Sequence, residues 1–167
     1  VFATKEIDKK TPSIQYAFFN VDTVIYQNAY GVSNVRKKTE AGLTTTYNLF
    51  SVTKTFTALA VLQLAQAGKI QLNKPISYYL PSFPYSVNIT VEQLLNHSSG
   101  IPNPLPLRWI HLTSEHNNFN RNIFFDSLFI KHQKLAFEPG TKFKYSNLGY
   151  ILLEQLVEKV SGQSYEE

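Results

Sequence analysis

The pattern of apolar and polar positions changes near residue 50 of this 167-residue chain. Before that point, residues 13–20 and 23–30 are rich in Ile, Val, Tyr and Phe, and the short connection Asn20-Val21-Asp22 separates them. Two β-branched and aromatic runs joined by so short a connection predict an antiparallel hairpin. The polar residues 31–45 that follow are expected to form an irregular loop.

A nearly continuous apolar segment then begins at Ser51 and predicts a helix over residues 51–67. The segment is apolar on almost every side, which is typical of a helix that is buried inside a protein. Gly68 stands just beyond it, where glycine commonly ends a helix. We therefore expect this helix to form part of the core.

Residues 68–167 carry weaker patterns that predict a mainly helical region interrupted by proline and glycine. Thr90-Val91-Glu92-Gln93 is a capping-box sequence and predicts the start of a short helix. Residues 148–160 predict a longer helix, because their apolar positions recur at helical spacing and Gly162 follows them. Helical pieces are expected in residues 103–134. Other predicted features are a turn at residues 137–140 and a short extended run at residues 142–145.

Composition indicates a folded, globular protein of one domain. Hydrophobic residues make up 43% of the chain, aromatic residues 14% and charged residues 17%, whereas disordered chains have few aromatic residues and many charges. The net charge of +4 comes from scattered basic residues, and solvated turns explain the few basic pairs better than a nucleic-acid-binding surface does. No apolar run reaches the roughly 18 to 20 residues that span a membrane.

No metal and no cofactor are expected. The chain has no cysteine, so it has no thiolate ligand or cysteine nucleophile. His111 and His116 lack the spacing of a helical metal-binding pair, and His132 has no acidic or histidine neighbour. His97 precedes a Ser-Ser-Gly turn, and we expect its ring to bond to the amides of that turn. The chain has no glycine-rich nucleotide-binding loop and no Gly-x-Ser-x-Gly sequence.

Ser51 and Lys54, at the start of the predicted helix, are candidates for chemistry. Positions three apart are neighbours on a helix, so the serine hydroxyl is expected to lie beside the lysine amine. A serine needs a neighbouring base to act as a nucleophile, and an ammonium cannot be that base. Desolvation by an apolar helix and the positive end of the helix dipole both disfavour the charged form of lysine. The competing interpretation is that Ser51 only caps the helix and Lys54 lies on the surface.

Tyr145-Ser146-Asn147, at the start of the last predicted helix, forms a second candidate group. A phenol can relay a proton between a serine and a lysine, and an asparagine amide can bind a substrate carbonyl or the lysine. The hypothesis therefore requires Tyr145 to converge on Ser51 and Lys54. A position of this phenol on the far side of the molecule would contradict it.

Together these segments resemble the superfamily of serine β-lactamases and penicillin-binding proteins, particularly its class C β-lactamase, DD-peptidase and esterase-like branch. Residues 46–54 are similar to the approach to the family's S-x-x-K nucleophile, and residues 68–72 to the segment after that helix. Residues 94–102 are similar to its L-L-x-H-T-S-G-L-P stretch. Residues 137–147 resemble the region of its second motif.

The resemblance implies an α+β, β-lactamase-like fold, in which an antiparallel sheet flanked by helices accompanies a helical region. Residues 1–50 would supply the hairpin and loop of the sheet region, residues 51–67 the nucleophile helix and residues 68–167 the helical region. The family's K-T-G or H-x-G strand lies downstream of these segments. We therefore expect the chain to be the N-terminal part of a longer domain and to be inactive alone. The absence of methionine from a chain that begins with valine indicates that its native N-terminus is missing or was cleaved.

The resemblance also implies the role of each candidate residue. Ser51 would be the acylated nucleophile, Lys54 its proton partner, Tyr145 the general base or relay, and Asn147 a polar contact to substrate and lysine. The expected activity of the whole protein is that of a serine hydrolase acting on a β-lactam, a D-Ala-D-Ala peptide or a small ester. The alternative is a catalytically silent β-lactamase-like binding or assembly module.

Partners and location follow from the same resemblance. The expected partners are the acyl substrate, together with a second copy of the chain or the missing C-terminal half, either of which would cover exposed surface. No nucleic-acid partner is expected. The resemblance favours the periplasm, the cell surface or secretion, and nothing in the residues excludes the cytoplasm.

Overall fold

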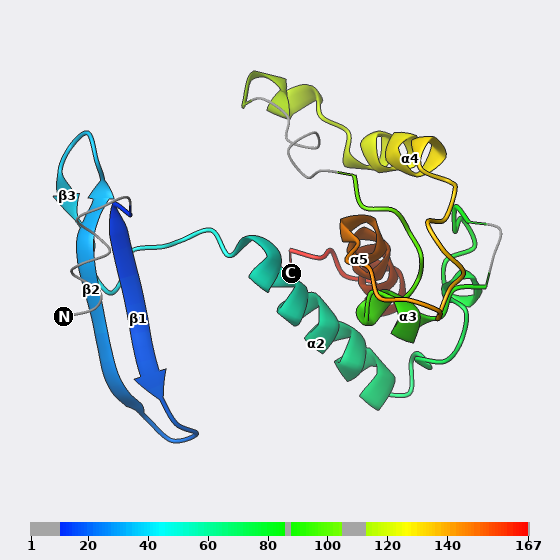
Figure 1. Ribbon diagram of the computed structural model, residues 1–167, viewed down its shortest axis with the longest axis horizontal. Coiled ribbons are helices and arrows are strands. Elements are labelled where there is room, and N and C mark those ends of the chain that lie inside the picture. The colour runs from blue at the N-terminus through cyan, green and yellow to red at the C-terminus, as the bar shows by residue number, and fades with distance from the viewer. Residues whose placement is uncertain (1–10, 86–87, 105–112, 167) are drawn as a thin grey trace. The chain divides into compact units, whose positions relative to one another are not determined.

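A computed structural model describes residues 11–85, 88–104 and 113–166 (Figure 1). The chain separates into two compact units, Val1–Leu49 and Phe50–Glu167. The described part of the first unit contains the strands, and that of the second contains the helices. Among the described residues, no helix has the length and apolar character needed to cross a membrane.

The first unit contains the predicted hairpin. Strands β1 (Ser13–Phe19) and β2 (Val24–Asn34) pair antiparallel. The side-chain oxygen of Asn20 accepts hydrogen bonds from the backbone amides of Asp22 and Thr23 at 3.0 and 2.8 Å, which closes the turn between them. The prediction from residues 20–22 is therefore confirmed.

The loop expected from residue 31 is wrong at its start. Strand β2 continues to Asn34 and pairs with β3 (Thr39–Glu40), so the strand order is β1-β2-β3. The polar side chains of this stretch bond within a second hairpin: the hydroxyl of Ser33 donates to the carbonyls of Thr39 and Glu40, and the side chain of Asn34 accepts from the amide of Lys37. The polar side chains of residues 33–40 therefore stabilise a tight hairpin.

The second unit begins with a 3₁₀ turn, η1 (Phe50–Val52), which leads into α2 (Thr53–Gln66). The predicted helix is thus present, and Gly68 follows it in the left-handed conformation. The prediction that it is buried all round is wrong for this structure. Only Thr57 and Val61 of α2 are buried, because one side of the helix packs against α5 (Asn147–Ser161). The large apolar side chains that are about half exposed are Phe56, Leu59 and Leu62.

The core of the second unit is built by helices whose starts the sequence marks. Helix α3 (Val91–Leu95) begins with the expected capping box, in which Thr90 and Gln93 exchange two hydrogen bonds of 3.1 and 3.0 Å. Helix α5 buries the apolar face that the sequence predicts and ends before Gly162 in the left-handed conformation. The fully buried leucines of α5 are Leu148, Leu152, Leu153 and Leu156. The other helical elements are η2 (Ile76–Tyr78), η4 (Thr113–Asn118) and α4 (Arg121–Lys131).

The segment that precedes α5 is attached by its backbone to the loop that follows α3. The amides of Ala136, Gly140 and Lys144 donate to the carbonyls of Gly100, Ser98 and His97 at 2.8, 2.8 and 2.9 Å. Residues 142–145 belong to no strand of the described part of the chain, and their expected extended conformation stays a prediction. The backbone bonds to the loop after α3 fix the approach of this segment to α5.

Replacing Gly100 by alanine is expected to destabilise this attachment. Gly100 has φ 76°, and a Cβ there would lie 2.2 Å from the carbonyl oxygen of Phe137. A left-handed non-glycine residue alone costs about 1 to 3 kcal/mol, and the clash adds to that cost. Urea denaturation of the whole protein should show a lower midpoint for Gly100→Ala.

Gly42→Ala is the matched control, because Gly42 is outside the left-handed region and a Cβ there meets no atom within 4 Å. Equal midpoints for the two variants would contradict the assigned role of Gly100.

Candidate active site

The structure brings together the four residues that the sequence singles out. Oη of Tyr145 lies 2.8 Å from Oγ of Ser51, and Nζ of Lys54 lies 2.7 Å from Oδ1 of Asn147. Nζ of Lys54 also lies 3.5 Å from Oγ of Ser51, at the outer limit of a hydrogen bond. The phenol is therefore the closer of the two groups to the serine hydroxyl.

Ser51 is free of the structural role that the competing interpretation gave it. The N-cap of α2 is Val52, which makes no side-chain hydrogen bond to the helix, so Ser51 as a helix cap is wrong. Ser51 lies in the preceding 3₁₀ turn and is exposed. Its neighbour Phe50 has φ 45°, in the left-handed region that non-glycine residues rarely adopt. Backbone strain of this kind is common beside functional groups.

Lys54 is half-buried and in contact with the second candidate group. Besides donating to Asn147, its Nζ lies 5.1 Å from the ring centroid of Tyr145 and 5.6 Å from that of Tyr150. The apolar environment expected for Lys54 therefore comes mainly from these two rings. The helix's own Phe56, which follows Lys54 by two positions, is 58% exposed.

Tyr145 is acidified by its neighbours. Burial by itself raises the pKa of its phenol, but hydrogen bonds with Lys54 and Ser51 and the positive charge of Lys54 together outweigh burial and lower that pKa below its ordinary value. A phenol of lowered pKa beside a serine hydroxyl has the chemistry of a general base. Once deprotonated, it would accept the hydrogen of Ser51.

His97 contributes to the site in a way that the sequence did not predict. Its Nδ1 accepts a hydrogen bond from the amide of Ser146 at 3.2 Å, so the expected bond to the adjacent Ser-Ser-Gly turn is wrong. The ring lies against those of Tyr145 and Tyr150, with centroids 4.5 and 5.0 Å away. Burial, and then the charge of Lys54, lower the pKa of His97. The neutral ring can accept the bond that holds the segment carrying Tyr145.

Asn147 is the first residue of α5, after the N-cap Ser146. Its backbone amide and its Nδ2 both donate to Oδ1 of Asn103, at 3.1 and 2.9 Å. Both ends of the Asn147 amide are therefore occupied, one by Lys54 and the other by Asn103. Asn103 follows the family-like stretch ending at Pro102, but no recognisable motif includes it, and sequence reasoning missed it.

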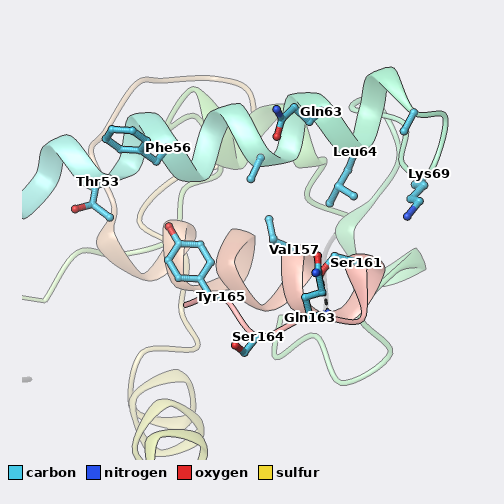
Figure 2. A pocket seen from close by; sticks show the side chains of 12 residues that line it. Thr53, Phe56, Gln63, Leu64, Lys69, Val157, Ser161, Gln163, Ser164 and Tyr165 are labelled. Atoms are coloured by element: carbon cyan, nitrogen blue, oxygen red, sulfur yellow. Dashed lines mark hydrogen bonds between the residues drawn. The ribbon is translucent and has the colours of Figure 1, made fainter. Parts of the chain in front are cut away.

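Two hollows adjoin the site along α2. The smaller, of about 270 Å³, includes Lys54, Thr57, Asn147 and Tyr150 in its lining. The larger, of about 520 Å³, lies between α2 and the residues after α5 and contains none of the four candidate residues (Figure 2). Tyr165 borders both hollows, and its hydroxyl is hydrogen-bonded to that of Thr57. The smaller hollow is the one in contact with the candidate chemistry.

No cluster of three or more histidine, aspartate or glutamate side chains with the arrangement of a metal site occurs among the described residues. His111, considered above as half of a histidine pair, lies outside the residues that the structure describes. The site as described therefore consists of a serine, a lysine, two tyrosines, a histidine and two asparagines.

Comparison with known proteins yields a family and several relatives. A family profile described as Beta-lactamase matches residues 2–167. Protein flp of Staphylococcus aureus (strain COL) is 40% identical over 150 residues, which cover 85% of this chain and 28% of flp. Penicillin-binding protein 4* of Bacillus subtilis (strain 168) is 32% identical over 142 residues, covering 85% of this chain and 31% of that protein. The chain thus spans about a third or less of these relatives' length.

Solved structures show the same fold. The octameric penicillin-binding protein homologue from Pyrococcus abyssi superposes with a TM-score of 0.79 and 29% identity, covering 99% of this chain and 39% of the homologue. EstCE1, a hydrolase with promiscuous acyltransferase activity, gives a TM-score of 0.76 and 26% identity over 98% of this chain and 46% of EstCE1. The predicted α+β fold of β-lactamase type is confirmed, and the chain contains a part of it.

The low pKa of Tyr145 is expected to depend on Lys54. In Lys54→Met, burial still acts on the phenol while the hydrogen bond and the charge of Lys54 are lost, so the pKa of Tyr145 should rise. The ultraviolet absorbance of ionised tyrosine, followed against pH in the whole protein, measures this change. Subtracting the curve of the matching Tyr145→Phe variant isolates the one phenol.

Lys69→Met serves as the control for this titration, because Lys69 lies beyond the other end of α2 and is not among the groups that shift the pKa of Tyr145. A Tyr145 titration that Lys54→Met leaves in place would show that the lysine does not acidify the phenol.

Proposed function

The chain belongs to the beta-lactamase family, and on this premise we propose that the whole protein is a serine hydrolase that forms an acyl-enzyme on Ser51. The observation that carries the proposal is the 2.8 Å contact between Oη of Tyr145 and Oγ of Ser51. It joins an exposed serine hydroxyl to a phenol whose pKa is lowered. Activation by an adjacent base is what a serine nucleophile requires.

In the proposed acylation, Oγ of Ser51 attacks the carbonyl carbon of the acyl donor while its proton passes to the Tyr145 phenolate. The tetrahedral intermediate then collapses, the bond from the carbonyl carbon to the leaving group breaks, and the leaving group takes the proton from Tyr145. The acyl group remains on Ser51 as an ester. In deacylation, water attacks this ester and gives its proton to the Tyr145 phenolate. The bond between the carbonyl carbon and Oγ of Ser51 then breaks, Tyr145 returns the proton to Oγ, and the carboxylic acid leaves.

Lys54 and Asn147 support this proton transfer. The positive charge of Lys54 favours the phenolate form of Tyr145, and the 2.7 Å hydrogen bond to Asn147 holds the lysine beside the phenol. Lys54 is thus proposed to act in its charged form through Tyr145, and not as the neutral base beside Ser51 that the sequence interpretation considered. In this account the contact of Asn147 to Lys54 matters more than a contact of Asn147 to substrate.

The proposed substrates are acyl compounds: a β-lactam, a D-Ala-D-Ala peptide or a small ester. Relatives named as a penicillin-binding protein and as a hydrolase with acyltransferase activity support acyl transfer as the shared chemistry. Self-association of the whole protein is a further proposal, supported by the octameric homologue and by the exposed apolar side chains of Phe56, Leu59 and Leu62 on α2.

Covalent labelling tests the proposal. The whole protein, treated with a fluorescent penicillin and with an ester-directed phosphonate, is expected to carry label on Ser51, located by mass spectrometry of its peptides. Ser51→Ala should abolish labelling, and Tyr145→Phe should slow it by about 10²- to 10⁴-fold, the usual contribution of a general base.

Ser127→Ala is the matched serine control, because Ser127 is exposed on α4 and its hydroxyl donates to the carbonyl of Phe124 in the same helix. Failure of both reagents to label Ser51 would reject the enzyme hypothesis for these substrates and favour the alternative, a catalytically silent binding or assembly module.

A further inference from the structure

We propose that Asn103 is a positioning residue that holds the Asn147 amide with its oxygen toward Lys54. This inference rests on the proposed function, since it concerns the same site. The Oδ1 atom of Asn103 accepts two hydrogen bonds from Asn147, one from the backbone amide at 3.1 Å and one from Nδ2 at 2.9 Å. The opposite end of the same amide, Oδ1 of Asn147, accepts from Nζ of Lys54 at 2.7 Å.

The orientation of the Asn147 amide matters because its two ends have nearly the same shape and opposite hydrogen-bonding character. A carbonyl oxygen accepts and an NH₂ group donates, whereas a charged lysine only donates. If the amide turned over, its NH₂ would face Lys54, and two donors would meet. Asn103 prevents this, because its oxygen accepts from the NH₂ end and would repel the carbonyl end.

Asn103 is itself held in place by the start of α5. The first backbone amides of a helix have no partner within the helix, and here Ser146 accepts from Gly149 while Asn103 accepts from Asn147. The carbonyl of Pro102 also accepts from the hydroxyl of Ser146 at 3.2 Å. Two hydrogen bonds therefore hold residues 102–103 to residues 146–147, and the Nδ2 bond is a third.

A role for Asn103 in helix capping alone would not explain the hydrogen bond that it accepts from Nδ2 of Asn147. Capping the helix requires only the bond to the backbone amide of Asn147, and that bond would form whatever the side chain of residue 147 did. The second bond acts on the side chain alone and determines which atom Lys54 meets. It uses one of the two N–H groups of Nδ2, so a substrate carbonyl could bond only to the other.

Two substitutions of Asn103 separate orientation from packing. Asn103→Leu keeps the approximate volume and removes the acceptor, and we expect acylation of Ser51 in the whole protein to slow by about 10- to 100-fold, as loss of an orienting contact does. Asn103→Asp keeps an oxygen for both bonds and should retain most of the rate. Its added negative charge disfavours the phenolate of Tyr145, so the acidic limb of the pH–rate profile should move to higher pH.

Two controls accompany these variants. Asn122→Leu, at an exposed position of α4, measures the effect of the same substitution away from the site. In an Asn147→Ala background, Asn103→Leu should have little further effect on the rate, because the amide that it orients is gone. Urea midpoints show whether each variant folds.

The outcomes distinguish this inference from the proposed function. Wild-type labelling at Ser51 with an equal rate in Asn103→Leu would overturn the role of Asn103 and leave the proposed function standing. If Asn103→Leu does not fold, a large loss of rate in Asn103→Asp, which keeps the acceptor for both bonds, overturns it instead. If wild type takes no label, the proposed function fails, and crystal structures of both proteins decide: an Asn147 oxygen still bonded to Lys54 in Asn103→Leu overturns the inference, and a turned or displaced amide supports it.

Discussion

The arrangement of the site depends on the attachment of the segment before α5 to the loop after α3. Tyr145 and Asn147 are 94 and 93 positions from the residues that they contact, Ser51 and Lys54. Backbone hydrogen bonds from residues 136–144 to residues 97–100, and the bond from the amide of Ser146 to the ring of His97, bring these distant positions within reach. This attachment fixes the segment that carries Tyr145, and packing of α2 against α5 then sets its distance from Ser51 and Lys54.

The charge of Lys54 contributes to the pKa shifts of two neighbours. The charge of Lys54 contributes to the lowered pKa of Tyr145, where burial opposes it, and to the lowered pKa of His97, where burial acts in the same direction. For the phenol the result favours the anion, and for the imidazole it favours the neutral ring. The phenolate of Tyr145 can then accept a hydrogen bond from Ser51, and the neutral ring of His97 can accept one from the amide of Ser146.

Features that depend on nearby residues were predictable from the sequence, and those that depend on remote partners were not. The capping box at Thr90 and the apolar face of α5 follow from spacings of three or four residues, which the chain displays directly. The convergence of Tyr145 on Ser51 was a hypothesis from residue chemistry that the family resemblance supported, and no local spacing could predict it. The partner of His97 and the role of Asn103 arise where two loops meet, and no local pattern in either loop encodes the other. For the same reason the half-exposed face of α2 was mistaken for a buried one: composition shows that a face is apolar, but not what packs against it.

Helices α2 and α5 both have their N-termini at the site. Lys54 lies in the first turn of α2 and Asn147 is the first residue of α5, so both helix N-termini, with their partial positive charge, are near Tyr145 and Ser51. That field favours anions, including a phenolate and the oxyanion of an acyl-transfer intermediate. Packing of α2 against α5 keeps the two ends together. Packing between these two helices thus also affects the electrostatics of the site, because it holds two positive helix ends near the phenol of Tyr145.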